Sequence, residues 1–446
     1  MFPLSKYPKA ITRLISLTLV ISSSLLWSAQ VAAEGVSSAQ ATNQTSTAVA
    51  IKGYAIPIGG ALRSDNDEVW ERIVKLAGGK GAKFVIFGTA SENPEASAKQ
   101  AAENLRRRGA VVEILPIAPR LGWVDLYKAT RDPTMIDKVR HAKGIFFTGG
   151  AQERIVDTLS PKGVSTPILD AIWESYRRGA VVAGTSAGAA IMSTIMFRDA
   201  LAVTDVLKGR WQDGKEVDQG LGFVGANLFV DQHFLKRGRF ARMIPLMVSK
   251  GYKLGLGVDE NTAVVIHGDD IEVLGGSGAV VVDLLQSRTN AAQEAFNIAN
   301  VRLTYLEAGD HFNFKTRVAA PADYKLRGQK LDPTEPTYKP EYTDDMFRID
   351  MLGASALSNS MAYLIDSTRT EVSGLGFDSL PKPNDPLASL GFLFRLYKGE
   401  GSVGYYTEER GTEAYTILNI YMDISPVRVP YPFYSAWPAG KQTSKL

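Results

Sequence analysis

Short apolar runs alternate with amphipathic segments over much of the N-terminal half of the chain. The runs at 54–58, 84–87 and 111–117 are rich in β-branched and aromatic residues, and the segments around 68–76 and 96–108 carry apolar residues at helical spacing. Strands that alternate with helices in this way are typical of βα repeats and a parallel sheet. The pattern predicts an α/β fold with a largely parallel sheet.

Two further strands end in glycine turns. The run Ile145-Phe146-Phe147 leads to Thr148-Gly149-Gly150, and the run 180–183 leads to Gly184-Thr185-Ser186, followed by a helix-like segment at 189–195. Ligands of open parallel sheets bind beyond the carboxyl ends of the strands. Both turns are therefore expected at one functional edge.

The pattern becomes strand-rich after residue 255, with 301–306 expected as a closing strand. Beyond residue 318 the composition shifts toward Pro, Tyr, Asp and Lys, and Gly-flanked apolar runs at 392–396, 403–407 and 415–421 indicate short antiparallel strands. We expect one domain at 51–317 and a β-rich C-terminal extension at 318–446.

The first residues have the layout of a secretory signal. Lys6, Lys9 and Arg13 precede the apolar stretch 14–26, and Val31-Ala32-Ala33 supplies small residues for cleavage. The stretch is short for a membrane span. We expect a signal peptide at 1–33, a flexible linker at 34–50, and a secreted or periplasmic protein that is free of the membrane after cleavage.

Composition narrows the chemistry. The formal net charge of +3 equals the three basic residues of the signal, which has no Asp or Glu, so the rest of the chain is neutral and nothing points to nucleic acid. The chain has no cysteine, which excludes disulfides, cysteine-based zinc sites and a cysteine nucleophile. No metal-ligand spacing is evident, and neither a metal nor another cofactor is expected. Only four histidines can serve as a base.

The turn Gly184-Thr185-Ser186-Ala187-Gly188 has the G-x-S-x-G pattern of a nucleophile elbow. A sharp strand-to-helix turn exposes the serine hydroxyl, and flanking glycines remove side chains that would clash. The alternative is a small-residue turn that only packs a helix on a strand. If Ser186 is the nucleophile, the N–H of Ala187 and that of Gly149 or Gly150 are candidate oxyanion donors.

A serine nucleophile needs a base and an acid that orients it. His233 follows an apolar run that reads as a strand, whereas His141, His267 and His311 lie at a helix end or in turns, so His233 is the best candidate. The residues leave the acid open among Asp231, Asp259 and Glu260. Because no suitable histidine follows near the C-terminus, the chain order argues against an ordinary α/β-hydrolase.

Four motifs in this order resemble the cyanophycinases of peptidase family S51, over roughly residues 52–316. They are Phe147-Thr148-Gly149-Gly150-Ala151-Gln152, Gly184-Thr185-Ser186-Ala187-Gly188-Ala189, Asp231-Gln232-His233-Phe234-Leu235-Lys236-Arg237-Gly238-Arg239 with Arg242, and Gly257-Val258-Asp259-Glu260-Asn261-Thr262. The chain differs from the family pattern at Ala151, where a polar residue is common, and in its length beyond residue 317.

The resemblance implies a three-layer α/β sandwich related to class I glutamine amidotransferases and flavodoxin, a homodimer, and a triad of Ser186, His233 and Glu260. It also implies that the substrate pocket is lined by Gln152, Asp231, Gln232, Arg237, Arg239 and Arg242. Guanidinium groups suit aspartyl carboxylates, while Asp231 could receive a substrate arginine or organise the arginines.

The implied function is that of an exported serine exopeptidase, with oxyanion donors at Gly150 and Ala187. It would cleave cyanophycin, a polyaspartate with arginine on each β-carboxyl, to β-Asp-Arg dipeptides. The alternatives are an aspartyl or isoaspartyl dipeptidase of the same family and a non-catalytic polymer-binding protein that uses the extension. Under these hypotheses the binding partner is cyanophycin or another aspartyl peptide.

Overall fold

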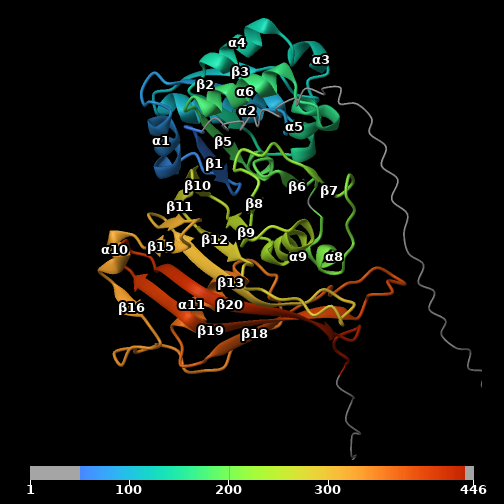
Figure 1. Ribbon diagram of the computed structural model, residues 1–446, viewed down its shortest axis with the longest axis vertical. Coiled ribbons are helices and arrows are strands. Elements are labelled where there is room, and N and C mark those ends of the chain that lie inside the picture. Colours follow the sequence, from blue (N-terminus) through green and yellow to red (C-terminus); the bar gives the residue numbers. More distant parts are fainter. Residues whose placement is uncertain (1–50, 200, 437–446) are drawn as a thin grey trace, which may run out of the picture. The chain divides into compact units, whose positions relative to one another are not determined.

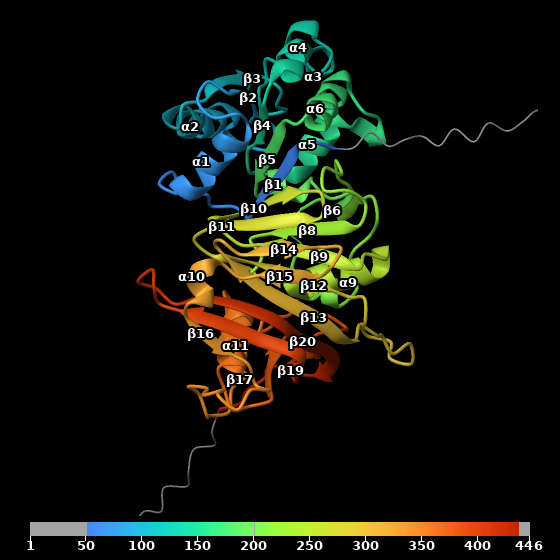
Figure 2. The same ribbon diagram turned by 60° about the vertical axis from the view of Figure 1, so that its left-hand side comes forward.

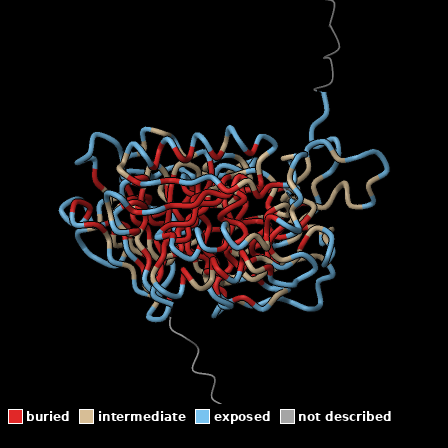
Figure 3. Tube along the Cα trace, turned by 90° about the horizontal axis from the view of Figure 1, so that it is seen from above, coloured by how far each residue is buried: buried red, intermediate tan, exposed pale blue. Residues whose placement is uncertain are grey.

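A computed structural model describes residues 51–199 and 201–436. The signal peptide and the linker expected at 1–33 and 34–50 lie outside the described residues. Among those described, no helix combines the length and apolar character needed to cross a membrane. The described residues belong to one compact unit, with the buried positions gathered in its interior (Figure 3).

The first sheet contains the predicted parallel strands. They are ordered β3-β2-β4-β5-β1, with bounds Val111–Leu115, Lys83–Phe87, Gly144–Phe147, Val181–Thr185 and Tyr54–Ile58. Antiparallel strands then extend the sheet beyond β1, in the order β10 (Thr262–His267), β11 (Asp270–Gly275), β14 (His311–Asn313) and β15 (Val318–Ala320). The parallel part therefore ends at β1, and the carboxyl ends of β4 and β5 lie side by side.

Helices cover both faces of the parallel strands (Figure 1). One face packs against α1 (Asp67–Leu76) and α2 (Pro94–Arg107), whose apolar sides share a core with β1 and β2. The other packs against α4 (Pro133–His141), α5 (Gln152–Leu159) and α6 (Pro167–Arg177). Each helix buries one apolar stripe, as its sequence spacing predicts. The expected three-layer α/β sandwich is confirmed.

A second sheet follows the order β17-β18-β19-β20-β13-β12-β9-β8 (Figure 2). Its strands are β8 (Leu228–Gln232), β9 (Leu254–Val258), β12 (Gly278–Asp283), β13 (Ile298–Glu307), β17 (Phe347–Arg348), β18 (Glu371–Gly376), β19 (Leu390–Thr407) and β20 (Ala414–Arg428), with β16 (Gln329–Leu331) paired to β19. The helices α9 (Phe240–Lys250) and α11 (Ala356–Ile365) share one core with this sheet. The remaining elements are α3 (Leu126–Ala129), the 3₁₀ helix η1 (Pro161–Gly163), α7 (Ala187–Ala190), β6 (Ile195–Phe197), α8 (Val203–Leu207), β7 (Val217–Gln219) and α10 (Asp323–Leu326).

The structure corrects three expectations. The strand expected to close the domain is β13, which lies inside the second sheet because β20 pairs with its other edge. The runs 392–396 and 403–407 form the single strand β19, because Gly401 (φ +71°) sits in a bulge rather than a hairpin turn. The helix α11 was not anticipated in the extension. The boundary at residue 317 stays a prediction, and strands from both sides of it share the second sheet.

Candidate active site

Ser186 stands on a strained turn directly after β5. Its φ of +53° is unusual for a residue with a side chain and lifts the hydroxyl out of the strand direction. A β-carbon on Gly184 would come within 2.3 Å of Gly188 O, and one on Gly188 within 2.7 Å of Phe147 O. Both positions therefore need glycine, because neighbouring backbone atoms leave no room for a β-carbon. This is the physical reason for the flanking glycines of the G-x-S-x-G pattern.

The helix after Ser186 is shorter than the sequence suggested. Instead of a helix over 189–195, the structure has one turn, α7, after which the chain passes into β6. The helix dipole that four residues supply is correspondingly small. Any oxyanion stabilisation at this turn therefore depends on the individual N–H groups.

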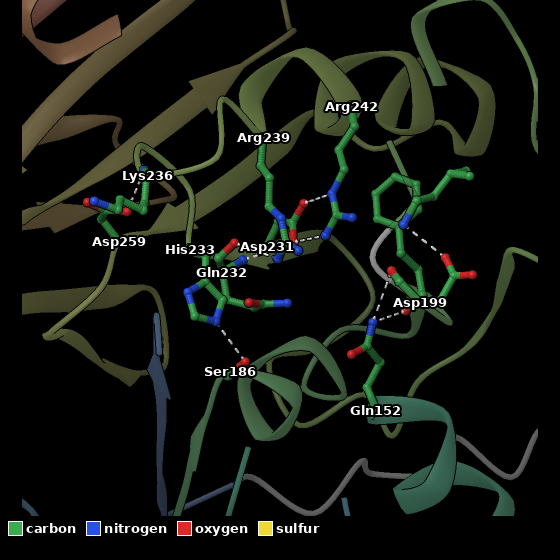
Figure 4. A network of polar contacts seen from close by, with 12 residues as sticks. Gln152, Ser186, Asp199, Asp231, Gln232, His233, Lys236, Arg239, Arg242 and Asp259 are labelled. Atoms are coloured by element: carbon green, nitrogen blue, oxygen red, sulfur yellow. Dashed lines mark hydrogen bonds and ion pairs between the residues drawn. The ribbon is translucent and has the colours of Figure 1, made fainter. Parts of the chain in front are cut away.

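Ser186, His233 and Glu260 form a continuous hydrogen-bonded chain. The Ser186 hydroxyl lies 2.9 Å from His233 Nε2 (Figure 4), and His233 Nδ1 lies 2.6 Å from Glu260 Oε1. A carboxylate only accepts, so Nδ1 carries the proton and Nε2 is left to accept from the serine. The three residues come from two sheets, because Ser186 follows β5, His233 follows β8, and Glu260 connects β9 to β10.

Burial sets the protonation state of His233, the candidate base. The His233 side chain is only 10% exposed, and this desolvation lowers the pKa of His233, although the hydrogen bond that His233 donates to Glu260 acts in the opposite direction. Arg237 and Arg239 add to the lowering through their positive charge. His233 is therefore held neutral near pH 7, the form that a general base requires.

The two other carboxylates that the sequence left open have different partners. Asp259 Oδ1 accepts from the backbone N–H of Leu235 at 3.1 Å and of Lys236 at 2.9 Å, and Asp259 Oδ2 accepts from the Ser277 hydroxyl. It ties the loop after His233 to the turn that carries Glu260. No sequence signal distinguished this role from that of an acid.

Asp231 is fully engaged by arginine. Its two oxygens accept from Nε and Nη2 of Arg242 at 2.7 Å each, and Arg239 Nη1 lies 3.6 Å away. Burial alone would raise the pKa of Asp231, but the two guanidinium groups outweigh it and the net pKa is lowered. In this arrangement the carboxylate organises the arginines rather than presenting itself to a ligand.

The predicted pocket residues gather on one side of the Ser186–His233 pair, apart from Arg237, which is solvent-exposed. Gln152 Nε2 donates to Phe197 O at 2.8 Å, and Figure 4 shows the side chains of Gln152 and Gln232 approaching the same space. Gln232 Oε1 and Arg242 Nη1 are buried and have no hydrogen-bond partner within the described chain. These two atoms are suited to a polar ligand, because a buried polar group without a partner is costly.

A cavity of 250 Å³ opens on the other side of Ser186 and His233. Leu62, Trp70 and Phe146 supply apolar walls, and the hydroxyl of Thr148 is buried without a partner among the described residues. Gly149 also borders the cavity, and a β-carbon on it would lie 3.3 Å from Ser186 Cβ. No sequence signal indicated this cavity, since its walls come from α1, α2, the ends of β4 and β5, and the loops that follow β1, β4, β5 and β8.

Ala187, Gly149 and Gly150 supply the candidate oxyanion donors. Ala187 is the first residue of α7, so its N–H has no acceptor within the helix. Within residues 51–199 and 201–436, no backbone carbonyl of a loop or turn accepts a hydrogen bond from the N–H of Gly149, Gly150 or Ala187. Those described residues also hold no cluster of three His, Asp or Glu side chains able to bind a metal ion. Ser186, His233 and Glu260, together with these N–H groups, are the kinds of group that acyl transfer to a serine requires.

Comparison with known proteins agrees with this chemistry. The profile described as "Peptidase family S51" matches residues 56–274. A cyanophycinase from Trichormus variabilis is 31% identical over 291 residues, covering 63% of this chain and 92% of the relative. One from Geminocystis herdmanii is 30% identical over 276 residues, covering 60% and 95%. A solved peptidase from an acI-B1 actinobacterium is 22% identical, covers 59% of this chain and 98% of its own, and has a TM-score of 0.45.

The α/β sandwich and the sequence matches define a serine peptidase. The chain belongs to peptidase family S51, because it spans nearly the full length of curated relatives that are 30 to 31% identical to it. The family resemblance of the four sequence motifs is thereby confirmed.

Proposed function

We infer that this chain is an exported serine exopeptidase that hydrolyses cyanophycin to β-Asp-Arg dipeptides. The observation that carries this proposal is the unbroken hydrogen-bonded chain from Ser186 through His233 to Glu260. The relatives named as cyanophycinases supply the substrate class.

The proposed reaction is acyl transfer to the serine. His233 Nε2 takes the proton as Ser186 Oγ attacks a backbone carbonyl of the polymer, and Glu260 stabilises the resulting imidazolium. The N–H groups of Gly150 and Ala187 receive the oxyanion. His233 then returns the proton to the leaving amine, and a water that it activates hydrolyses the acyl-enzyme.

The charges on one side of Ser186 support an aspartyl substrate. Arg239 remains protonated at neutral pH although burial lowers its pKa to about 9, and Arg242 keeps one guanidinium nitrogen unpartnered among the described residues. Cyanophycin offers a carboxylate on each arginine, which matches a guanidinium donor. Gln152 and Gln232 add amide donors and acceptors beside them, while Arg237 supplies further positive charge at the exposed rim.

The decisive experiment is incubation of the protein lacking residues 1–33 with insoluble cyanophycin, followed by mass analysis of the soluble products. We expect β-Asp-Arg, and none from Ser186→Ala. Cleavage of short aspartyl peptides without any β-Asp-Arg would favour the dipeptidase. Polymer binding without Ser186-dependent turnover would favour a binding protein.

Export is a separate part of the proposal, supported by the basic and apolar layout of residues 1–33. An insoluble polymer cannot enter a cell intact, so an enzyme that uses it from outside must be exported. N-terminal sequencing of the protein recovered from the periplasm or medium of an expressing bacterium should begin at Glu34. A full-length N-terminus in the cytoplasmic fraction would contradict export.

A further inference from the structure

The loop after His233 lies between two supports. On one side, Asp259 accepts the N–H groups of Leu235 and Lys236. On the other side is the C-terminal extension, because the Ser355 N–H donates to Leu235 O at 3.0 Å. The Leu235 N–H is thus bonded to Asp259, in the turn that carries Glu260, and the Leu235 carbonyl accepts from Ser355 of the extension.

The second point of contact with the extension is at Gly238. This glycine has φ +57°, and a β-carbon on it would come within 2.4 Å of Leu352 O and 2.9 Å of Leu352 Cα. Backbone of the extension therefore packs directly on the loop, between the two arginines Arg237 and Arg239. A flexible side chain could yield to such a contact, but a backbone held in a packed segment cannot.

The extension segment is itself firmly held. Met351 is fully buried, and its N–H donates to Leu375 O of β18 at 2.7 Å. Leu352 N donates to the carboxylate of Asp350 at 3.0 Å, which shapes the turn. Beyond the loop, Phe240 meets Phe394 of β19 edge-on at 5.4 Å. The loop after His233 thus packs against a segment that is itself hydrogen-bonded to the second sheet.

The extension also holds a second segment beside the site. Asp385 forms ion pairs with Arg210 and with Lys208, whose side chain is only 1% exposed. The same stretch of chain between β5 and β8 contains Phe197, whose ring lies under the Arg242 guanidinium at 4.3 Å. Residues beyond 317 therefore contact both the loop after His233 and the connection between β5 and β8 that contains Phe197.

We propose that residues 350–355 of the C-terminal extension are a positioning element of the active site, which sets the place of His233 and the following arginines. The inference rests on the proposed function only in taking His233 as the base. His233 has φ +47°, a conformation that needs support from its surroundings. The family profile ends at residue 274, and the match to the Trichormus relative leaves over a third of this chain unmatched. This support is therefore a feature that the family resemblance does not supply.

The test is the rate at which a fluorophosphonate labels Ser186 in the full chain. Gly238→Ala should slow labelling about tenfold or more, because a small displacement of a catalytic group is costly. The matched control is Gly251→Ala. Gly251 has φ +78° and no other atom lies near the position of a β-carbon, so this variant introduces the backbone strain without a steric clash. The final labelled fraction counts the folded molecules, so a loss of fold lowers that fraction and leaves the rate of the rest unchanged.

A second pair of variants changes only the extension. Asp350→Ala removes the acceptor that shapes the Leu352 turn, and Asp378→Ala removes the same kind of turn acceptor, to Leu380 N–H, elsewhere in the extension. We expect slower labelling and a shifted acid limb of its pH profile for Asp350→Ala alone. Equal rates and pH profiles for each variant and its control would overturn the inference. Absence of labelling in the unmodified protein would instead refute the serine mechanism.

Discussion

The imidazole of His233 lies against the backbone of Gly60. A β-carbon at residue 60 would come within 2.2 Å of His233 Cε1 and 2.4 Å of Nε2. The same segment accepts the His233 N–H through Gly59 O at 2.7 Å, and Gly60 O accepts the Asn261 N–H beside Glu260 at 2.8 Å. The turn after β1 therefore positions His233 and Glu260 together, although Gly59 and Gly60 contribute no side chain.

Gly60→Ala should abolish most of the activity, because the new methyl group must displace the His233 ring from its hydrogen bond with Ser186. We expect a loss of about 10²-fold or more in kcat for cyanophycin. Gly78→Ala is the matched control, since Gly78 has φ +109° against +110° for Gly60 and no atom near its β-carbon position. Comparable activity of the two variants would show that the Gly60 contact is unimportant.

Glu260→Gln should leave the fold intact and lower kcat by about 10³- to 10⁴-fold, because the amide no longer favours the Nδ1-protonated ring or stabilises the imidazolium. Glu272→Gln, in a partly exposed pair with Arg72, is the control and should keep full activity. Release of soluble dipeptide from the polymer measures both. A Glu260→Gln enzyme with near-normal kcat would remove Glu260 from the mechanism.

The pH dependence follows from the buried base. Because burial lowers the pKa of His233 below its ordinary value of 6.5, the acid limb of kcat/KM should have an apparent pKa below 6.5. The folded state also takes up this proton less readily than the unfolded chain, so His233 makes stability rise with pH across the window between the lowered pKa and 6.5. An acid limb above 6.5 would contradict the placement of the base.

Asp231→Asn should destabilise the fold by about 3 kcal/mol, because it leaves Arg242 and Arg239 buried without a counter-charge. Asp65→Asn breaks a pair with Arg63 in which both side chains are 67% exposed, and it should change the stability little. Urea denaturation of both variants compares the free energies of unfolding. Equal stabilities would mean that the arginines are not held by Asp231.

The sequence predicted the α/β sandwich well because its signals are local. Each strand from β1 to β5 is a short apolar run, and each covering helix shows an apolar stripe. The spacing of apolar residues therefore indicates both where an element lies in the chain and which of its faces is buried. It failed at α7 and β19 for the opposite reason. Whether a glycine such as Gly401 ends a strand or forms a bulge depends on the partner strand, which local spacing does not contain.

The sequence by itself determined the kind of chemistry. The absence of cysteine, the scarcity of histidine and the glycine-flanked Ser186 selected a serine nucleophile and His233 as its candidate base. Residue chemistry and spacing left the acid open, and the family resemblance only implied Glu260. The tertiary structure shows that Glu260 is the carboxylate that contacts His233, because Asp231, Asp259 and Glu260 are chemically alike and differ in their neighbours. It also decided that the extension supports the loop after His233, through a backbone contact between Gly238 and Leu352. Contacts between residues more than a hundred positions apart depend on the pairing of whole sheets, and no local pattern records them.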